Sequence, residues 1–283
     1  MRDDPQRAEF PVQSRGLYAL VASLSDAGRK RRQNEDSHLV LSLDGAGASR
    51  SGEASTYDIA QPGLLLAVAD GMGGQEGGDV ASRLTLAIVA REVTAHLHQT
   101  AAGRADVPLA LEQAVVAAHQ AVMARARENP AMKSMGTTLT AAFLCGSRAD
   151  VVQVGDSRAY LYRDGNLILL TQDQTIGNRL RQRGSDPASI NTQFRDLLTQ
   201  AVGAQAEIKP VTTAVDLEPR DTILMCTDGL HKLIPPEGIV GILDMDTPLA
   251  QRASQLVTLA NDNGGPDNIT VIVAEIRPTE AAK

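Results

Sequence analysis

The sequence is poor in aromatic side chains. Phe, Trp and Tyr together make up 2% of it, and Trp is absent. A protein with so few rings has little on which to stack exposed bases, which argues weakly against a binder of single-stranded nucleic acid. The core must therefore consist mainly of Leu, Val, Ile and Ala. The hydrophobic share of 43% and the charged share of 22% are ordinary for a globular protein.

Cysteine is almost as scarce. Cys145 and Cys226 are the only two, and both lie in apolar runs, where a thiol behaves as a small buried hydrophobe. Two such residues cannot form a disulfide framework or a cysteine-based zinc site. We therefore expect both thiols to be buried and to have no catalytic role.

Long apolar segments and excess positive charge are missing as well. No apolar stretch approaches the ~18 residues of a membrane span, and residues 1–13 lack the apolar segment of a signal peptide. The 27 Lys and Arg against 34 Asp and Glu give a net charge of −7, which disfavours general nucleic-acid binding. The short basic run Arg29–Arg32 alone is typical of a solvated surface patch. We expect a cytoplasmic protein without membrane or nucleic-acid partners.

The hydrophobic pattern predicts an α+β protein with antiparallel sheets. Two long helices are expected in succession, and most strands follow one another without intervening helices. The predicted strands are 39–43, 63–69, 138–144, 151–154, 159–162, 167–170, 222–226 and 269–276. The predicted helices are 79–97, one that begins near Asp106, a short piece at 176–183, and 248–260. Residues 44–63 read as a long loop, and Asp164-Gly165 as a hairpin turn.

We expect a single domain. It would span residues 17–277, between flexible tails at residues 1–16 and 278–283, because no internal repeat or linker divides the chain.

Five aspartates border apolar strands: Asp36, Asp70, Asp156, Asp228 and Asp267. Any one of them is more often a turn or capping residue than a ligand. Five together suggest carboxylates gathered in one cleft, where they repel each other unless they are protonated or neutralised by a cation. An all-oxygen set without histidine suits Mg²⁺ or Mn²⁺ better than zinc.

The glycine-rich segment Gly71–Gly74 does not match a phosphate-binding loop. It lacks the Gly-Lys-Ser/Thr ending of a P-loop and the spacing of a dinucleotide fingerprint. Glycines here would instead let the backbone approach a metal and offer a carbonyl oxygen.

Six segments, in this order, resemble the metal-dependent protein phosphatase family of the 2C type, in its bacterial branch. They are Arg31–Asp36, Ala69–Gly74, Gly136–Thr138, Val154–Arg158, Thr227–Leu230 and Gly265–Thr270. The resemblance covers about Val21 to Glu275. It implies a β-sandwich of two antiparallel sheets flanked by pairs of α-helices, with two Mn²⁺ or Mg²⁺ ions and a third, weaker one in a cleft.

The resemblance also assigns roles. The implied metal ligands are Asp36, Asp70, the Gly71 carbonyl, Asp228 and Asp267, with Asp156 for the third ion. Arg31 matches the phosphate-binding arginine, and Glu35 would lie beside the centre. The implied reaction is hydrolysis of phosphoserine and phosphothreonine in proteins, the products of a Ser/Thr kinase, by in-line attack of a hydroxide that bridges the metals. We expect a monomer.

Some positions depart from the family pattern. Met72 stands where many eukaryotic relatives have a histidine proposed as proton donor, and the flap at residues 174–206 is divergent, with Asp196 where relatives often carry Asn. His38 and His231 are the remaining histidines near the motifs, and we expect neither to be the donor. Three alternatives stay open: an inactive binding module with the same fold, a metallohydrolase of small phosphate esters, and, least favoured, a nucleic-acid binder.

Overall fold

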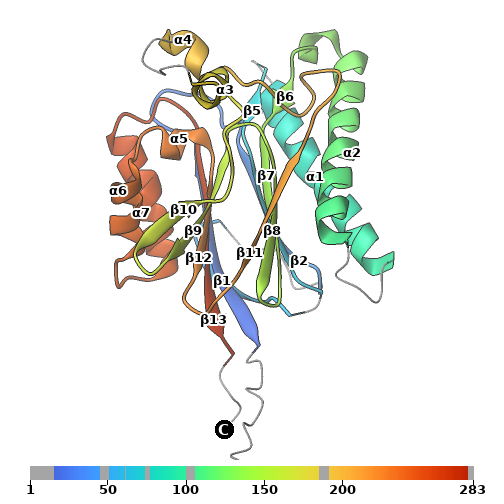
Figure 1. Cartoon of the computed structure of the whole chain (residues 1–283). Helices are drawn as coiled ribbons and strands as arrows, with labels where there is room; N and C mark the ends of the chain where they lie inside the picture. Colours follow the sequence, from blue (N-terminus) through green and yellow to red (C-terminus); the bar gives the residue numbers. More distant parts are fainter. Residues whose placement is uncertain are drawn as a thin grey trace, which may run out of the picture.

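The protein is represented by a computed structural model that describes residues 16–44, 51–60, 62–73, 77–99, 106–184 and 191–279. Four layers follow one another across it: a helix pair, a sheet, a second sheet and another helix pair (Figure 1). All strand pairs are antiparallel. The α+β β-sandwich flanked by helix pairs is thereby confirmed. The expected tails at 1–16 and 278–283 lie almost wholly outside the described residues.

The two large sheets face each other. The six-stranded sheet has the order β10 (Asn166–Leu169), β9 (Arg158–Arg163), β12 (Thr222–Cys226), β13 (Ile269–Pro278), β1 (Leu17–Asp26) and β3 (Ala54–Asp58). The five-stranded sheet has the order β11 (Val211–Asp216), β8 (Arg148–Val154), β7 (Leu139–Cys145), β4 (Leu64–Ala69) and β2 (Ser37–Ser42). A small ladder joins β5 (Gly71–Met72) to β6 (Gly136–Thr137).

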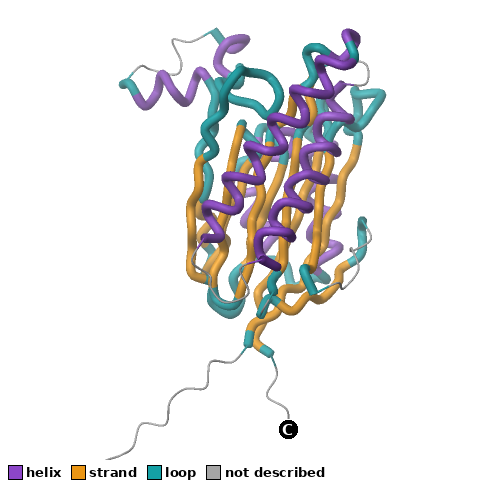
Figure 2. The backbone as a smooth tube through the Cα atoms, turned by 90° about the vertical axis from the view of Figure 1, so that its right-hand side faces the viewer, coloured by secondary structure: helices purple, strands orange, loops and turns teal. Residues whose placement is uncertain are grey.

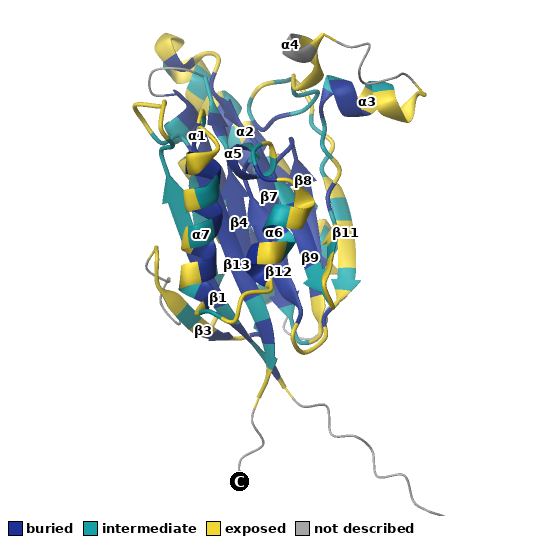
Figure 3. Ribbon diagram, turned by 90° about the vertical axis from the view of Figure 1, so that its left-hand side faces the viewer, coloured by how far each residue is buried: buried dark blue, intermediate teal, exposed yellow. Residues whose placement is uncertain are grey.

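A helix pair covers the outer face of each sheet. Helices α1 (Gly77–Gln99) and α2 (Val107–Glu128) lie over the five-stranded sheet (Figure 2). Helices α6 (Pro236–Leu243) and α7 (Leu249–Asp262) lie over the six-stranded one (Figure 3). The short elements are the 3₁₀ turn η2 (Pro130–Met132), α3 (Ile176–Gln182), α4 (Thr192–Arg195) and α5 (Asp228–His231).

Strand β4 shows why its sequence is a continuous apolar run. Leu64, Leu66 and Val68 pack between the two sheets, whereas Leu65 and Ala67 pack against the α1/α2 side. Successive side chains of a strand point to opposite faces, so a strand buried on both faces has no polar position. The strand is wholly buried, and its end is therefore a rigid support for the next residue, Asp70.

The fold contains elements that the sequence pattern did not predict. Strands β1 and β11 and helix α6 were not foreseen, and β3 lies inside the segment 44–63 that was expected to be a loop. Strands β11 and β3 lie at the edges of their sheets and most of their residues are exposed. Their sequences therefore lack the alternation of apolar and polar residues that marks a half-buried strand. Cys226 is buried as expected, but Cys145 is only partly buried at the end of β7.

Helix α2 also corrects an expectation. Among the described helices it is the one that is long and apolar enough to cross a membrane, by length and composition. Its residues Leu111, Val115 and Val122 are buried in the cluster between α1, α2 and the sheet. The core helix of a folded domain has the same composition, so this feature is weak evidence for a span.

Candidate metal centre

Three of the aspartates come together at one end of the five-stranded sheet, where its strands begin or stop. Ser37, at the start of β2, pairs with Ala69, at the end of β4, which places Asp36 and Asp70 side by side. Strands β8 and β4 are both antiparallel to β7. Asp156, after β8, therefore lies at the same end of the sheet as Asp70.

The other sheet brings two more aspartates to this end. Cys226, the last residue of β12, pairs with Val271, near the start of β13. Asp228 and Asp267 therefore lie at one end of the six-stranded sheet. That end faces the aspartates of the five-stranded sheet, since Asp228 and Asp267 act electrostatically on both Asp36 and Asp70.

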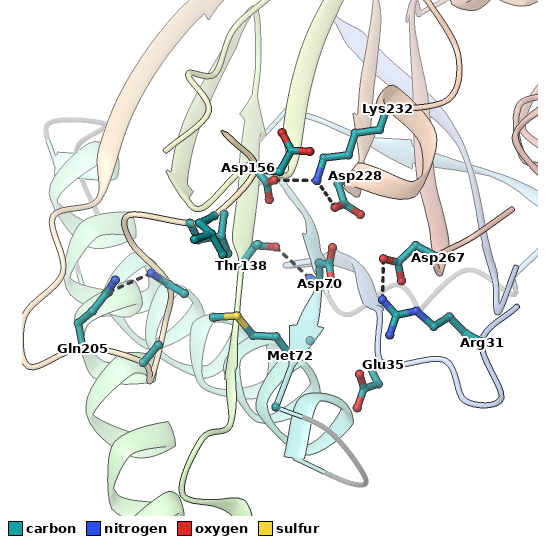
Figure 4. Close-up of a pocket in the computed structure, with 17 residues that line it drawn as sticks. Arg31, Glu35, Asp70, Met72, Thr138, Asp156, Gln205, Asp228, Lys232 and Asp267 are labelled. Atoms are coloured by element: carbon teal, nitrogen blue, oxygen red, sulfur yellow. Dashed lines mark hydrogen bonds and ion pairs between the residues drawn. The ribbon is translucent and has the colours of Figure 1, made fainter. Parts of the chain in front are cut away.

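A cavity of about 630 Å³ opens at this end (Figure 4). The side chains that line it are Arg31, Glu35, Asp70, Met72, Thr138, Asp156, Asp196, Leu197, Leu198, Ala201, Ala204, Gln205, Asp228, Lys232 and Asp267, and the backbone of Gly71 and Gly73 contributes as well. Asp36 is not among them, since it lies buried behind the others. Sequence-predicted residues thus form one wall, and the flap forms the wall opposite.

Asp36 is held by two threonines. Thr227 and Thr270 donate hydrogen bonds of 2.8 and 2.7 Å to its Oδ2, while Oδ1 has no partner. Burial, together with repulsion from Asp228, raises the pKa of Asp36 to about 7. A buried carboxylate with one unpaired oxygen and other carboxylates nearby needs a cation or a proton.

Asp70 is fixed mainly through its backbone. Its N–H donates to Thr138 Oγ1 at 3.0 Å, and its carbonyl oxygen accepts from the Thr138 N–H and from Thr137 Oγ1, each at 2.9 Å. Burial and the surrounding aspartates hold the pKa of Asp70 well above its usual range. The Gly-Thr-Thr segment therefore positions the central carboxylate of the cluster.

Gly71 has no room for a side chain. A Cβ there would collide with the backbone oxygens of Gly78 and Glu35. The Glu35 carboxyl lines the cavity close to Gly78, at the start of α1. Burial raises the pKa of Glu35. The close passage of three backbone segments requires glycine here and brings the start of α1 next to the carboxyl cluster.

Arg31 is paired with one of the aspartates. Its Nη2 donates to Asp267 Oδ2 at 2.9 Å, and this bond raises the pKa of the guanidinium. Asn268 holds the loop from which Arg31 projects, because it donates to the Gln33 carbonyl and accepts from the Glu35 N–H. About half of the Arg31 side chain is exposed, so the guanidinium is open to the cavity.

Lys232 is a cavity residue that sequence reasoning missed. Its Nζ lies 2.6 Å from Asp228 Oδ2 and 3.4 Å from Asp156 Oδ2 (Figure 4). Burial alone would raise the pKa of Asp228, but the Lys232 charge outweighs it and lowers that pKa. Burial and repulsion from Asp228 raise the pKa of Asp156 to about 6. The spacing of four residues from Asp228 was the signal in the sequence.

The donor set fits hard divalent cations. The ligands on offer are carboxylate and carbonyl oxygens, and both Asp36 Oδ1 and Asp228 Oδ1 are buried without a hydrogen-bond partner. Within the described residues, no three acidic, histidine or cysteine side chains already form a metal-binding cluster. Backbone carbonyl and water oxygens would therefore have to complete each coordination shell, as is usual for Mg²⁺.

Neither His38 nor His231 is among the residues that line the cavity. His231 Nε2 is 3.0 Å from the Asp156 backbone oxygen, and burial lowers the pKa of His231 to about 4. Burial also lowers the pKa of His38. Met72, by contrast, does line the cavity. That no histidine donates the proton stays a prediction.

A family comparison agrees with this geometry. The family model described as "Protein phosphatase 2C" matches residues 53–263. The chain belongs to the protein phosphatase 2C family. Both the resemblance stated from the motifs and its bacterial branch are confirmed, since the matching proteins named below are bacterial.

Two curated relatives illustrate the similarity. The serine/threonine protein phosphatase PstP of Mycobacterium tuberculosis is 37% identical over 263 residues, which cover 92% of this chain and 45% of that protein. The serine/threonine phosphatase stp of Listeria monocytogenes is 32% identical over 256 residues, covering 89% and 93%. The chain thus spans about half the length of the mycobacterial 2C-type relative and nearly all of the listerial one.

Solved structures share the fold. The catalytic domain of PstP in complex with 2 manganese ions superposes with a TM-score of 0.73 at 35% identity, covering 92% of this chain and 99% of that one. The serine/threonine phosphatase of S. agalactiae gives a TM-score of 0.76 at 25% identity, with the same coverage.

Proposed function

We propose that this 2C-type chain is a metal-dependent phosphatase that hydrolyses phosphoserine and phosphothreonine in proteins. The observation that carries the proposal is the convergence of Asp70, Asp156, Asp228 and Asp267 from both sheets on one cavity, beside an exposed arginine and with Asp36 buried nearby. The Mn²⁺ in the PstP complex and the serine/threonine phosphatase names of the relatives support it.

The proposed metal ligands are the carboxylates of Asp36, Asp70, Asp228 and Asp267 with the Gly71 carbonyl, and Glu35 lies beside them. Divalent cations, when bound, supply a water acidic enough to serve as nucleophile near neutral pH. The threonines that hold Asp36 and Asp70 keep these carboxylates in place before the cations arrive. Fixed ligands need no rearrangement during the reaction, which is the usual origin of electrostatic catalysis.

Arg31 is the proposed phosphate-binding residue. A planar guanidinium can donate to two phosphate oxygens at once. In the absence of substrate the Arg31 charge is paired with Asp267, so binding of a phosphate dianion would divide the guanidinium donors between the two. This arrangement links phosphate binding to the position of a metal ligand.

The cavity wall that faces the aspartates favours a peptide substrate. Leu197, Leu198 and Ala204 of the flap line it, together with Asp196. The flap is anchored at Val202, whose backbone exchanges two hydrogen bonds with Thr137. A phosphorylated side chain could enter between this wall and Arg31, with its flanking residues against the leucines. We also propose that the single domain spans 17–277 and acts in the cytoplasm as a monomer on the products of a Ser/Thr kinase.

The test compares two substrates under three metal conditions. Hydrolysis of a phosphothreonine peptide and of p-nitrophenyl phosphate is measured with Mn²⁺, with Mg²⁺ and after treatment with EDTA. We expect EDTA to abolish turnover of both substrates and either cation to restore it. Full turnover in a verified metal-free preparation would refute the proposal.

Two additions to this experiment separate the alternatives: phosphopeptides of different flanking sequence, and a column of the immobilised protein. p-Nitrophenyl phosphate has the better leaving group and should react faster if only chemistry matters. A protein phosphatase should offset this advantage through a lower KM for the phosphothreonine peptide. A small-ester hydrolase should not distinguish peptides of different flanking sequence. An inactive binding module should retain the peptide on a column without releasing phosphate.

A further inference from the structure

Lys232 occupies the space between two of the clustered aspartates. Its ammonium group bridges Asp156 Oδ2 and Asp228 Oδ2 at 3.4 and 2.6 Å (Figure 4). These two aspartates are the ones that would bind the third ion on the family pattern. The Asp156 side chain is only 5% exposed, so little else can neutralise it.

The backbone holds Lys232 there. Helix α5 begins at Asp228, and the Lys232 N–H donates to the Asp228 carbonyl at 3.0 Å, which places both side chains on one face of the turn. The side chain is 37% exposed, so its stem follows the cavity wall while the ammonium points inward. The flap residue Asp196 adds a further negative charge near the ammonium.

The two carboxylate oxygens of Asp228 have different surroundings. Oδ2 is bound by Lys232, whereas Oδ1 is buried without a partner and stays available to a metal of the main centre. A third divalent ion held by Asp156 and Asp228 would compete with Lys232 for Asp228 Oδ2 and would be repelled by the lysine charge. The two cations cannot share the space between Asp156 and Asp228.

We propose that the Lys232 ammonium replaces a third metal ion between Asp156 and Asp228. The chain would then bind only the two divalent cations of the main centre. The inference rests on the proposed metal-dependent function and adds a residue to it. Lys232 is a positioning residue, because it neutralises Asp156 and orients Asp228.

The test counts bound ions. Manganese bound per chain is measured by equilibrium dialysis and elemental analysis for the wild type and for Lys232→Met, which keeps the length of the side chain but removes its charge. Lys232→Gln is a second such variant, and Lys133→Met, at an exposed position, controls for loss of a surface charge. Crystals grown with Mn²⁺ show the ions directly by anomalous scattering.

We expect two bound ions in the wild type and in Lys133→Met, and three in Lys232→Met. The variant should bind its third ion with an affinity at least about tenfold higher than the affinity of the wild type for a third ion. The third ion should lie between Asp156 and Asp228 and should be lost when Asp156→Asn is added to Lys232→Met.

Equal affinity for a third ion in the wild type and in both Lys232 variants would overturn the inference. So would a third site that survives Asp156→Asn. If the wild type binds no manganese at all, the proposed function fails instead, so the two failures are distinguishable.

Discussion

Replacing Asp156 by Asn should make the metal-free protein more stable at neutral pH. Asp156 is buried, and this burial together with the nearby Asp228 raises the pKa of its carboxyl from 3.8 to about 6. A proton is therefore bound more tightly by the folded state than by the unfolded state. The stability that this carboxyl contributes is fully present below pH 4 and is lost as pH rises through about 6.

The size of the effect follows from the shift. A pKa higher by about two units corresponds to roughly 3 kcal/mol of unfolding free energy. Asparagine has the same shape and no charge to bury, so it escapes this loss. Groups remote from Asp156 titrate in both proteins, and their contributions cancel in the difference between wild type and variant.

The assay is urea denaturation in EDTA at pH 4.5 and pH 7.5, for the wild type, Asp156→Asn and the exposed control Asp246→Asn. We expect Asp156→Asn to gain about 2 kcal/mol over the wild type between the two pH values, because part of the titration lies below pH 4.5, and we expect Asp246→Asn to follow the wild type. A constant difference across the pH range, or a variant that is relatively less stable at pH 7.5, would refute the reasoning.

Further predictions concern the same centre. Asp228→Asn should lower kcat by on the order of 10²-fold or more, because it removes a charge from the proposed cation site; near-normal turnover with Mn²⁺ would contradict the ligand assignment. Arg31→Ala should mainly raise KM for a phosphothreonine peptide, by roughly tenfold, and unchanged steady-state constants would remove Arg31 from the site. His38→Ala and His231→Ala should each lose far less than the 10²-fold typical of a general acid; a loss of that size on the peptide but not on p-nitrophenyl phosphate would identify the proton donor. Thr270→Val should cost about 1–3 kcal/mol of unfolding free energy, since its hydroxyl is a buried donor to Asp36, and denaturation curves that coincide with the wild type would show that this bond is unimportant.

Local sequence determined much of the fold and the centre. The run Leu64–Ala69 could only be a strand buried on both faces, and it ends at Asp70. The Asp164-Gly165 pair has positive φ at both residues, as the predicted hairpin turn requires. These features depend on residues adjacent in the chain, so the pattern reveals them. The motif order then led to the family and to its fold.

Elements with weak local signals needed the tertiary structure. Strand β1 is specified by its partners, because it pairs with β13 along its whole length and with β3 on the other side. Strand β11 is mostly exposed at the edge of its sheet, and its six residues carry no apolar alternation. The conformation of such a segment depends on the neighbouring strands with which it pairs, and the local sequence does not show which strands these are.

The contacts that tune the centre were decided by tertiary structure as well. Thr227 and Thr270 lie 43 residues apart and both far from Asp36, yet they donate to the same oxygen. Lys232 meets Asp156 only because strands of two different sheets end at one edge. The sequence by itself determined which carboxylates were available for a metal centre. Only the packing of the two sheets decided their spacing, their pKa values and the lysine between them, because these depend on distances between segments remote in the chain.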